Sequence, residues 1–284
     1  MELKVLLKLS DNILDLLNLK KDCLYKTVFF FTFTFLFKMA NKQNTIFGIH
    51  PIEEAINSEV VIDKLFIQKD STNPKIEEII KILESSDVTI NFVPSEKLNR
   101  LTHGNHQGII AITSPIPFYP LEEIVEKILS EKEKPLFVIL DQISDVRNFG
   151  AIIRTAECTG VDAIIIQKKG GAPVTGDTVK TSAGAIFKIP ICKVDHIKDA
   201  IFYLKASNIT TVAATEKTTE SIYDLDLNTP LAIIMGSEGK GVSKSVLNIV
   251  DSKASLPLIG EVNSLNVSVA CGAFLYETIR QRGL

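Results

Sequence analysis

The chain has 284 residues, of which 45% are hydrophobic and 23% are charged. This composition is typical of a folded protein and excludes a disordered one, and the length fits one large or two ordinary domains. The net charge of −3 excludes a globally basic nucleic-acid-binding protein but not a local basic surface. No CxxC pair occurs among Cys23, Cys158, Cys192 and Cys271, so neither a zinc cluster nor a disulfide framework is indicated. A reducing cytoplasm is the expected compartment.

The first 38 residues contain an apolar run, Thr27–Phe37, that carries six of the fifteen phenylalanines. With eleven residues between two lysines it is too short for a membrane helix, which needs about 20. A signal peptide is disfavoured because no small-residue cleavage site follows. We interpret residues 1–38 as an unstructured extension that the function does not require, with a sticky strand or an anchor as the alternative.

Residues 39–114 are predicted to form a small α/β domain. Strands are expected at Val60–Ile67, Val88–Val93 and Gly108–Ile112. Between the first two, Pro74–Leu83 has apolar residues at the i, i+3, i+4, i+7 spacing of an amphipathic helix.

Residues 115–120 contain three prolines and are the best candidate for a linker. The second domain, residues 121–284, begins with an amphipathic helix at Leu121–Leu129. Apolar runs typical of strands buried on both faces then alternate with helical patterns, at Leu136–Leu140, Ala163–Ile166, Thr211–Ala214 and Leu231–Met235. This alternation predicts a mostly parallel sheet covered on both sides. Ligands of such sheets bind at the carboxyl ends of the strands, so the loops after these runs are where chemistry is expected.

The first such loop follows Leu140 and leads into a helix. Asn148 is suited to the N-cap of that helix, and Gly160 to its C-terminal stop. Arg154 lies beside the apolar stripe of the helix. Taken by itself, Arg154 is best interpreted as a surface residue that pairs with Glu157 at i+3.

The second loop, residues 236–243, has three glycines within six residues, which permits close approach of a ligand. It matches neither a Walker A loop nor G-x-G-x-x-G, and an ordinary strand-to-helix turn would also explain it. The third loop runs from Ile259 to Ser268. Ser264 is a candidate cap of the last helix, and Asn266 and Ser268 would then cluster at a helix N-terminus, a natural ligand site.

The three loops together carry a resemblance that none carries alone. The order N-x(5)-R, G-x-E-G-x-G and L-P-L…S-L-N-V-S resembles the three motifs of the SpoU (TrmH) family of RNA ribose 2′-O-methyltransferases in the SPOUT superfamily. Upstream, Phe47–Ala55 and His106–Ala111 resemble the ribosomal-protein-like substrate-binding domain of that family. The first motif departs from the usual Asp-Pro-x-Asn, since the chain has Asp145-Val-Arg-Asn148, which predicts a less rigid loop.

The resemblance implies an α/β fold in which a SPOUT trefoil-knotted, parallel-sheet catalytic domain follows the small substrate-binding domain. It implies S-adenosyl-L-methionine as cofactor, RNA as substrate, no metal, no membrane association and a homodimer in the cytoplasm. The positions that match the catalytic residues of the family are Asn148, Arg154, Glu238, Ser264 and Asn266. Those that match its cofactor-binding positions are Gly236, Leu256, Leu258 and Leu265.

Roles follow from this correspondence. Arg154 is expected to hold the substrate phosphate and assist proton removal, Glu238 to position Arg154 or its loop, and Asn266 and Ser264 to orient the ribose or Arg154. No histidine lies in the motif loops, although His103 or His106 could contact RNA. Basic residues expected near RNA are Lys97, Arg100, Arg147, Lys168, Lys169 and Lys240.

Within the family, the two-domain arrangement and the ending S-L-N-V-S-V-A most resemble the bacterial enzymes that methylate a guanosine of large-subunit (23S) rRNA. The same reaction on tRNA is the first alternative, and a non-catalytic RNA-binding assembly factor is the second. A dinucleotide-dependent oxidoreductase is disfavoured by the missing G-x-G-x-x-G.

Overall fold

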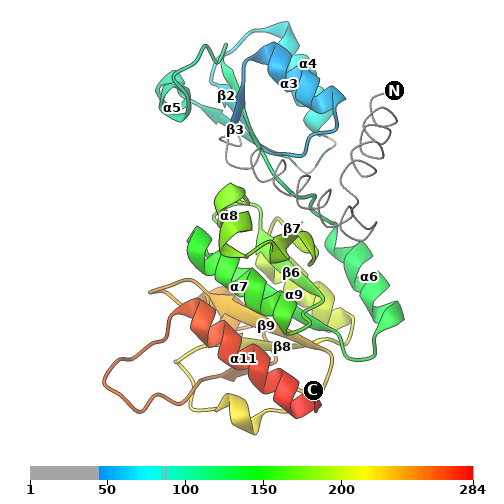
Figure 1. The fold of residues 1–284 in the computed structure, drawn as a ribbon, viewed down its shortest axis with the longest axis vertical. Helices are drawn as coiled ribbons and strands as arrows, with labels where there is room; N and C mark the ends of the chain where they lie inside the picture. Colours follow the sequence, from blue (N-terminus) through cyan, green and yellow to red (C-terminus); the bar gives the residue numbers. More distant parts are fainter. Residues whose placement is uncertain (1–44, 85, 87, 284) are drawn as a thin grey trace, which may run out of the picture. The chain divides into compact units, whose positions relative to one another are not determined.

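The computed structural model describes residues 45–84, 86 and 88–283, and these form two sheets with their helices (Figure 1). The apolar run at Thr27–Phe37 and the extension predicted for residues 1–38 lie outside this range. The first sheet has the order β1-β4-β2-β3, in which only the β2–β3 pair is parallel. Its strands are β1 (Thr45–Phe47), β2 (Ile62–Gln68), β3 (Thr89–Val93) and β4 (Ile109–Thr113). Its helices are α3 (Ile49–Asn57), α4 (Pro74–Glu84) and α5 (Ser95–Leu101).

The two faces of this sheet are covered unequally. Helices α3 and α4 bury one face through Ile52, Ile76 and Ile79, together with Leu65 and Ile67 of β2. The other face carries a much smaller cluster, in which α5 contributes Leu98. The strands predicted from the sequence agree with β2, β3 and β4 to within two residues at each end, and the helix prediction agrees with α4.

The second sheet has six strands in the order β10-β8-β9-β5-β6-β7, and every neighbouring pair is parallel, as predicted. The strands are β5 (Leu136–Asp141), β6 (Ala163–Gln167), β7 (Ile191–Val194), β8 (Thr210–Ala214), β9 (Leu231–Gly236) and β10 (Ser252–Ala254). The helices are α6 (Leu121–Glu131), α7 (Val146–Cys158), α8 (Gly176–Thr181), α9 (Ile197–Ala206), α10 (Lys244–Leu247) and α11 (Val267–Arg282), with short 3₁₀ turns η1 (Ala185–Phe187) and η2 (Ile222–Asp224).

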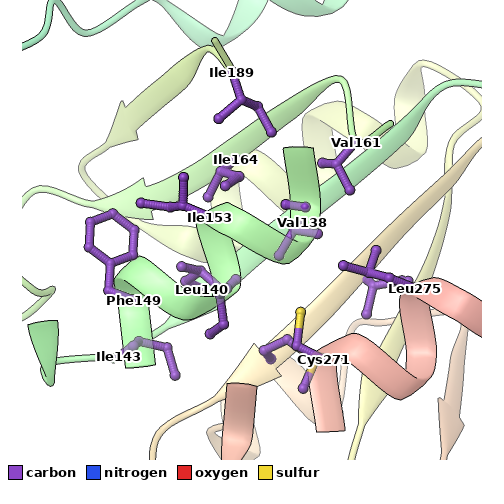
Figure 2. Packing of buried hydrophobic residues seen from close by; sticks show 14 of the residues in the cluster. Val138, Leu140, Ile143, Phe149, Ile153, Val161, Ile164, Ile189, Cys271 and Leu275 are labelled. Carbon is purple, nitrogen blue, oxygen red and sulfur yellow. The ribbon is translucent and has the colours of Figure 1, made fainter. Parts of the chain in front are cut away.

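Alternate side chains of β5 enter two separate cores, because successive residues of a strand point to opposite faces. Val138 and Leu140 join the core beneath α7, α8 and α11. Figure 2 shows Phe149 and Ile153 of α7 and Cys271 of α11 in this layer. Phe137 and Ile139 join the opposite core beneath α6, α9 and α10. This two-sided burial explains why the strand sequences are continuously apolar.

The buried cysteines belong to these cores and are not reactive groups. Burial raises the pKa of the Cys271 thiol to about 12. The pKa of the Cys192 thiol is also raised to about 12, mainly by burial and to a smaller extent by the negative charge of Glu122. Cys158, Cys192 and Cys271 are all free thiols. None of the helices in the described ranges is long and apolar enough to cross a membrane.

Three short strands escaped the sequence analysis. Strands β1 and β10 have three residues each, and β7 has four, so the period-2 pattern has too few positions to register. The domain boundaries at residues 39–114, 115–120 and 121–284 stay predictions, and so does the knot.

Helix α8 packs closely on α7, and Gly150 makes this possible. A Cβ atom at Gly150 would lie 1.9 Å from Thr181 Oγ1 and 3.0 Å from the backbone nitrogen of Ser182. Gly272, inside α11, is a matched position where a Cβ atom would meet only Thr155 Cγ2, at an ordinary 3.6 Å.

We expect Gly150→Ala to lower the free energy of unfolding by about 1–3 kcal/mol, because the two helices must separate. Gly272→Ala should be neutral or stabilising, since alanine is favoured over glycine in a helix by up to about 1 kcal/mol. Urea unfolding of both variants checks this. Equal stability of the two would contradict the close packing of α7 and α8.

Candidate functional site

The loops that follow β5, β9 and β10 meet at the carboxyl end of the parallel sheet, as predicted for ligand-binding loops. The loops after β9 and β10, together with the end of β8, surround a cavity of about 520 Å³. Its wall includes Thr215 and Glu216 after β8, Gly236 to Gly239 at the end of β9, and, after β10, Leu256, Leu258 and Asn263 to Asn266. Phe274 of α11 contributes to the apolar part of the wall.

The helix after the first loop is capped by Asp145, and the prediction of Asn148 was wrong. The Asp145 carboxylate accepts hydrogen bonds from the backbone nitrogens of Arg147, at 2.8 Å, and Asn148, at 2.9 Å. Asn148 is the third helical residue, and its side chain is therefore available for other contacts. Gly160, with φ +69°, follows the last turn of α7 as predicted.

The N-cap of α11 is Asn266, so the alternative in which Ser264 caps this helix was also wrong. Asn266 Oδ1 accepts hydrogen bonds from the backbone nitrogens of Ser268, at 2.9 Å, and Val269, at 3.4 Å. Ser264 lies two residues before the cap. Its side chain makes no capping hydrogen bond to the first turn of α11 in the described structure. It is exposed and lines the cavity.

Asn148, Glu238 and Asn266 form one hydrogen-bonded cluster that joins all three loops. Asn148 Nδ2 donates to Glu238 Oε1 at 2.8 Å. Asn266 Nδ2 donates to the same oxygen at 2.9 Å and to Asn148 Oδ1 at 3.0 Å. One oxygen of the Glu238 carboxylate thus accepts hydrogen bonds from two amide nitrogens, one from each of the other two motif segments.

The glycine-rich loop doubles back on itself directly after β9. A Cβ atom at Gly236 would lie 2.0 Å from the backbone nitrogen of Val242, so only glycine fits there. The segment that returns after this turn is held by Asp141, a buried residue at the end of β5. Its Oδ2 accepts a hydrogen bond of 2.8 Å from the backbone nitrogen of Ser243. The sequence analysis missed Asp141, although its place directly after a buried strand was a signal.

Arg154 lies apart from this cluster. It is exposed on α7 and does not line the cavity. The expected pair with Glu157 is absent, because Glu157 contacts Lys188 at 3.3 Å. Within the described part of the chain the Arg154 side chain has no hydrogen-bond or ion-pair partner, so Glu238 holds Asn148 and Asn266 and not Arg154.

The four residues predicted to bind a cofactor, Gly236, Leu256, Leu258 and Leu265, all line the cavity, together with Glu238, Ser264 and Asn266. Thr215 and Glu216 were not predicted from the sequence, because they follow the predicted strand at β8 but belong to none of the three motifs. In the described ranges no group of three or more His, Cys, Asp or Glu side chains is placed to hold a metal ion.

Comparison with known proteins places this geometry in a family. The model of the SpoU rRNA Methylase family matches residues 135–276, and a model described as RNA 2'-O ribose methyltransferase substrate binding matches residues 45–119. The chain belongs to the SpoU (TrmH) family of RNA methyltransferases, as its three motifs predicted.

Curated relatives share nearly their whole length with this chain. A TrmH-family protein of Bacillus subtilis, named for tRNA/rRNA methyl transfer, is 32% identical over 86% of this chain and 98% of its own. One from Staphylococcus aureus is 37% identical over 85% of this chain and 97% of its own.

Solved structures show the same fold. An rRNA methyltransferase from Sinorhizobium meliloti, with AdoMet bound, has a TM-score of 0.54 at 25% identity and covers 83% of this chain and 86% of its own. The SpoU methyltransferase AviRb from Streptomyces viridochromogenes has a TM-score of 0.54 at 23% identity, over 84% and 90% of the two chains.

Asn266 has two structural tasks that substitutions can separate. We expect Asn266→Ala to lower the free energy of unfolding by about 1 kcal/mol through loss of the cap. Asn266→Ser should recover most of that loss, because a serine hydroxyl also caps, although it cannot bridge Asn148 and Glu238. Calorimetric melting of both variants tests this, and a serine variant as unstable as the alanine variant would refute the capping role.

Proposed function

We propose that this chain transfers a methyl group from S-adenosyl-L-methionine to the ribose 2′-hydroxyl of a guanosine in large-subunit (23S) rRNA. The observation that carries the proposal is the cluster of Asn148, Glu238 and Asn266, which joins one residue from each of the three motif loops at the rim of a cavity. Family membership and two solved relatives with AdoMet bound support the choice of cofactor.

The residues of the cavity fit such a cofactor. Its volume of about 520 Å³ lies within the usual range for small-molecule sites, about 300–1,000 Å³. Leu256, Leu258 and Leu265 offer apolar contact, and Gly236 contributes backbone to the cavity wall. When bound, the cofactor supplies an electrophilic methyl group on a positively charged sulfur.

The chain's own polar residues then have to position the ribose and assist removal of the proton from its 2′-hydroxyl. An arginine remains protonated at physiological pH, so Arg154 binds the substrate phosphate and stabilises negative charge on the hydroxyl oxygen while that oxygen loses its proton to solvent water. Asn148 and Glu238 fix the loops between which the ribose enters. Ser264, on the cavity wall, orients the ribose.

The choice of rRNA rests on the model that matches residues 135–276, which is described as the SpoU rRNA Methylase family, whereas the model that matches residues 45–119 names RNA without its class. The relatives are named for both tRNA and rRNA, so tRNA is the competing substrate in the assay below. The polar residues of all three motifs are intact, which disfavours a non-catalytic assembly factor. We propose that the reaction takes place in the cytoplasm, because the RNA substrate is found there.

We expect purified protein to transfer labelled methyl from S-adenosylmethionine to 23S rRNA from a strain that lacks it, and Arg154→Ala to lower this rate by about 10²–10³-fold. Cofactor binding, measured by calorimetry, should be unchanged in the variant. Lys188→Ala, which removes a cation near the same helix, is the control and should retain activity. Methylation of tRNA alone would overturn the choice of substrate, and no transfer to any RNA would overturn the enzyme.

We further propose that the protein acts as a homodimer in which Arg154 serves the partner's site. Arg154 is about 9 Å along α7 from Asn148 and is absent from the cavity wall. The neighbouring helix α11 exposes Val269 and Tyr276, at 57% and 59%, and the motif loop exposes Ile259 and Val262 even more. An exposed apolar surface of this kind supports an interface between copies.

A mixed dimer tests the assignment of Arg154. Dimers that combine one Arg154→Ala chain with one Asn266→Ala chain, purified through two different tags, contain one complete site if Arg154 acts across the interface. We expect such dimers to regain about half of the wild-type rate, although each parent dimer should be far less active. A mixed dimer no more active than its parents would show that Arg154 serves its own chain.

A further inference from the structure

Two loops of the first domain are joined into one surface at the end of its sheet. The turn between β1 and α3 contacts the loop 102–108 between α5 and β4. Gln107 Oε1 accepts a hydrogen bond of 3.0 Å from the backbone nitrogen of Ile49, and the backbone nitrogen of Gly48 donates to Ile109 O at 3.2 Å. These contacts join the two segments that the sequence analysis matched to the family's first domain.

An aromatic side chain is held at this junction. A Cβ atom at Gly104 would lie 2.4 Å from Phe47 Cε2 and 2.5 Å from its Cζ, so the ring packs directly on the glycine backbone. Phe47 nevertheless remains 38% exposed. The ring is therefore fixed on one side by the protein and open to solvent on another.

The polar residues around Gly104 are also positioned by the protein. His106 Nδ1 accepts a hydrogen bond of 3.0 Å from the backbone nitrogen of Gly108, so its Nε2 carries the proton that is shared with Asn99 Oδ1 at 3.0 Å. This side chain ties the loop to α5. His106 thus has a structural role, while His103 and Asn105 on either side of Gly104 are exposed.

The charge of this surface suits an anion. Arg100, in the last turn of α5, and His103 are exposed, and in the described ranges neither has an acidic partner. Lys97, one turn earlier, lies 5.4 Å from the Phe66 ring and adds to the positive charge. Arginine and lysine without acidic partners are the groups that bind phosphates of nucleic acids.

We infer that Phe47, Arg100, His103 and Asn105 form a site for an unpaired nucleotide of the substrate RNA, which we call the loop patch. A base stacks on the open side of Phe47, the Asn105 amide contacts the base edge, and Arg100 with His103 binds the flanking phosphate. Sequence-specific recognition of RNA uses unstacked bases on aromatic side chains in this way, whereas duplex RNA offers no such base. The inference rests on RNA being the substrate, as proposed above.

The consequence is a preference for loops over duplexes. The probes are a fluorescein-labelled RNA hairpin with an unpaired loop and the same stem continued as a duplex, titrated with the full-length protein. We expect the hairpin to bind about tenfold more tightly, and Phe47→Leu, which keeps an apolar side chain on Gly104, to abolish this preference. Phe92→Leu is the matched control, because Phe92 is 56% exposed on β3 at the opposite edge of the sheet.

A second variant separates a phosphate contact from a merely structural role. Arg100→Gln should weaken binding of both probes and reduce the slope of log K against log salt by about 1. Phe47→Leu should leave that slope unchanged and raise KM for RNA methylation without changing kcat. Equal binding of hairpin and duplex by the wild type, or a Phe47→Leu variant with the wild-type preference, would overturn the loop patch.

The proposed function fails separately from this inference. Arg154→Ala should retain the preference for the hairpin, and Phe47→Leu should retain binding of S-adenosylmethionine. A wild type that prefers the hairpin but transfers no methyl group would leave the loop patch standing and overturn the enzyme. One that methylates RNA but binds both probes equally would do the reverse.

Discussion

The structure of the site depends on one carboxylate, that of Glu238, which holds two amide side chains from distant parts of the chain. Asn148 and Glu238 are separated by 90 residues, and Asn148 and Asn266 by 118. The order of the parallel sheet brings their loops to a single edge, since β5 lies next to β9 and β8 lies between β9 and β10. Packing alone leaves such loops free to diverge, and a charge-assisted hydrogen bond to each partner keeps them together.

The same residues connect stability with chemistry. Asn266 caps α11 with its oxygen and holds the two other motif loops with its nitrogen, so that the end of a core helix is aligned with the rim of the cavity. Asp141 similarly ends a buried strand and holds the return of the glycine-rich loop through Ser243. Substitutions at these positions therefore affect folding as well as activity, and a loss of activity there does not by itself identify a catalytic residue.

The sequence predicted those parts of the fold for which a long local pattern exists. Continuous apolar runs identified β5, β6, β8 and β9, and the parallel sheet followed from their alternation with helices. Both N-cap predictions failed, because Asp145 and Asn148, like Ser264 and Asn266, are all good capping residues two or three positions apart. Local propensity does not choose between such neighbours: the cap is the first member of one pair, Asp145, and the second member of the other, Asn266.

For the site, sequence order revealed which residues matter but not how they meet. The motif resemblance singled out Asn148, Glu238 and Asn266, yet their mutual hydrogen bonds depend on strand order, which no local pattern encodes. Glu216 belongs to no motif and was missed for the same reason. The opposite case is Arg154, for which the local pattern suggested a partner, Glu157, that the fold assigns to Lys188.

The charge of the chain limits how it can recognise RNA. Residues 39–284 carry 25 Lys and Arg against 30 Asp and Glu, so a diffuse electrostatic attraction to phosphate is weak. Affinity has to come from a few cations that the protein does not neutralise, of which Arg154 and Arg100 are examples among the described residues. Weak non-specific binding of RNA helps an enzyme to release its methylated product. Selectivity among RNAs then depends on a few positioned contacts and not on total charge.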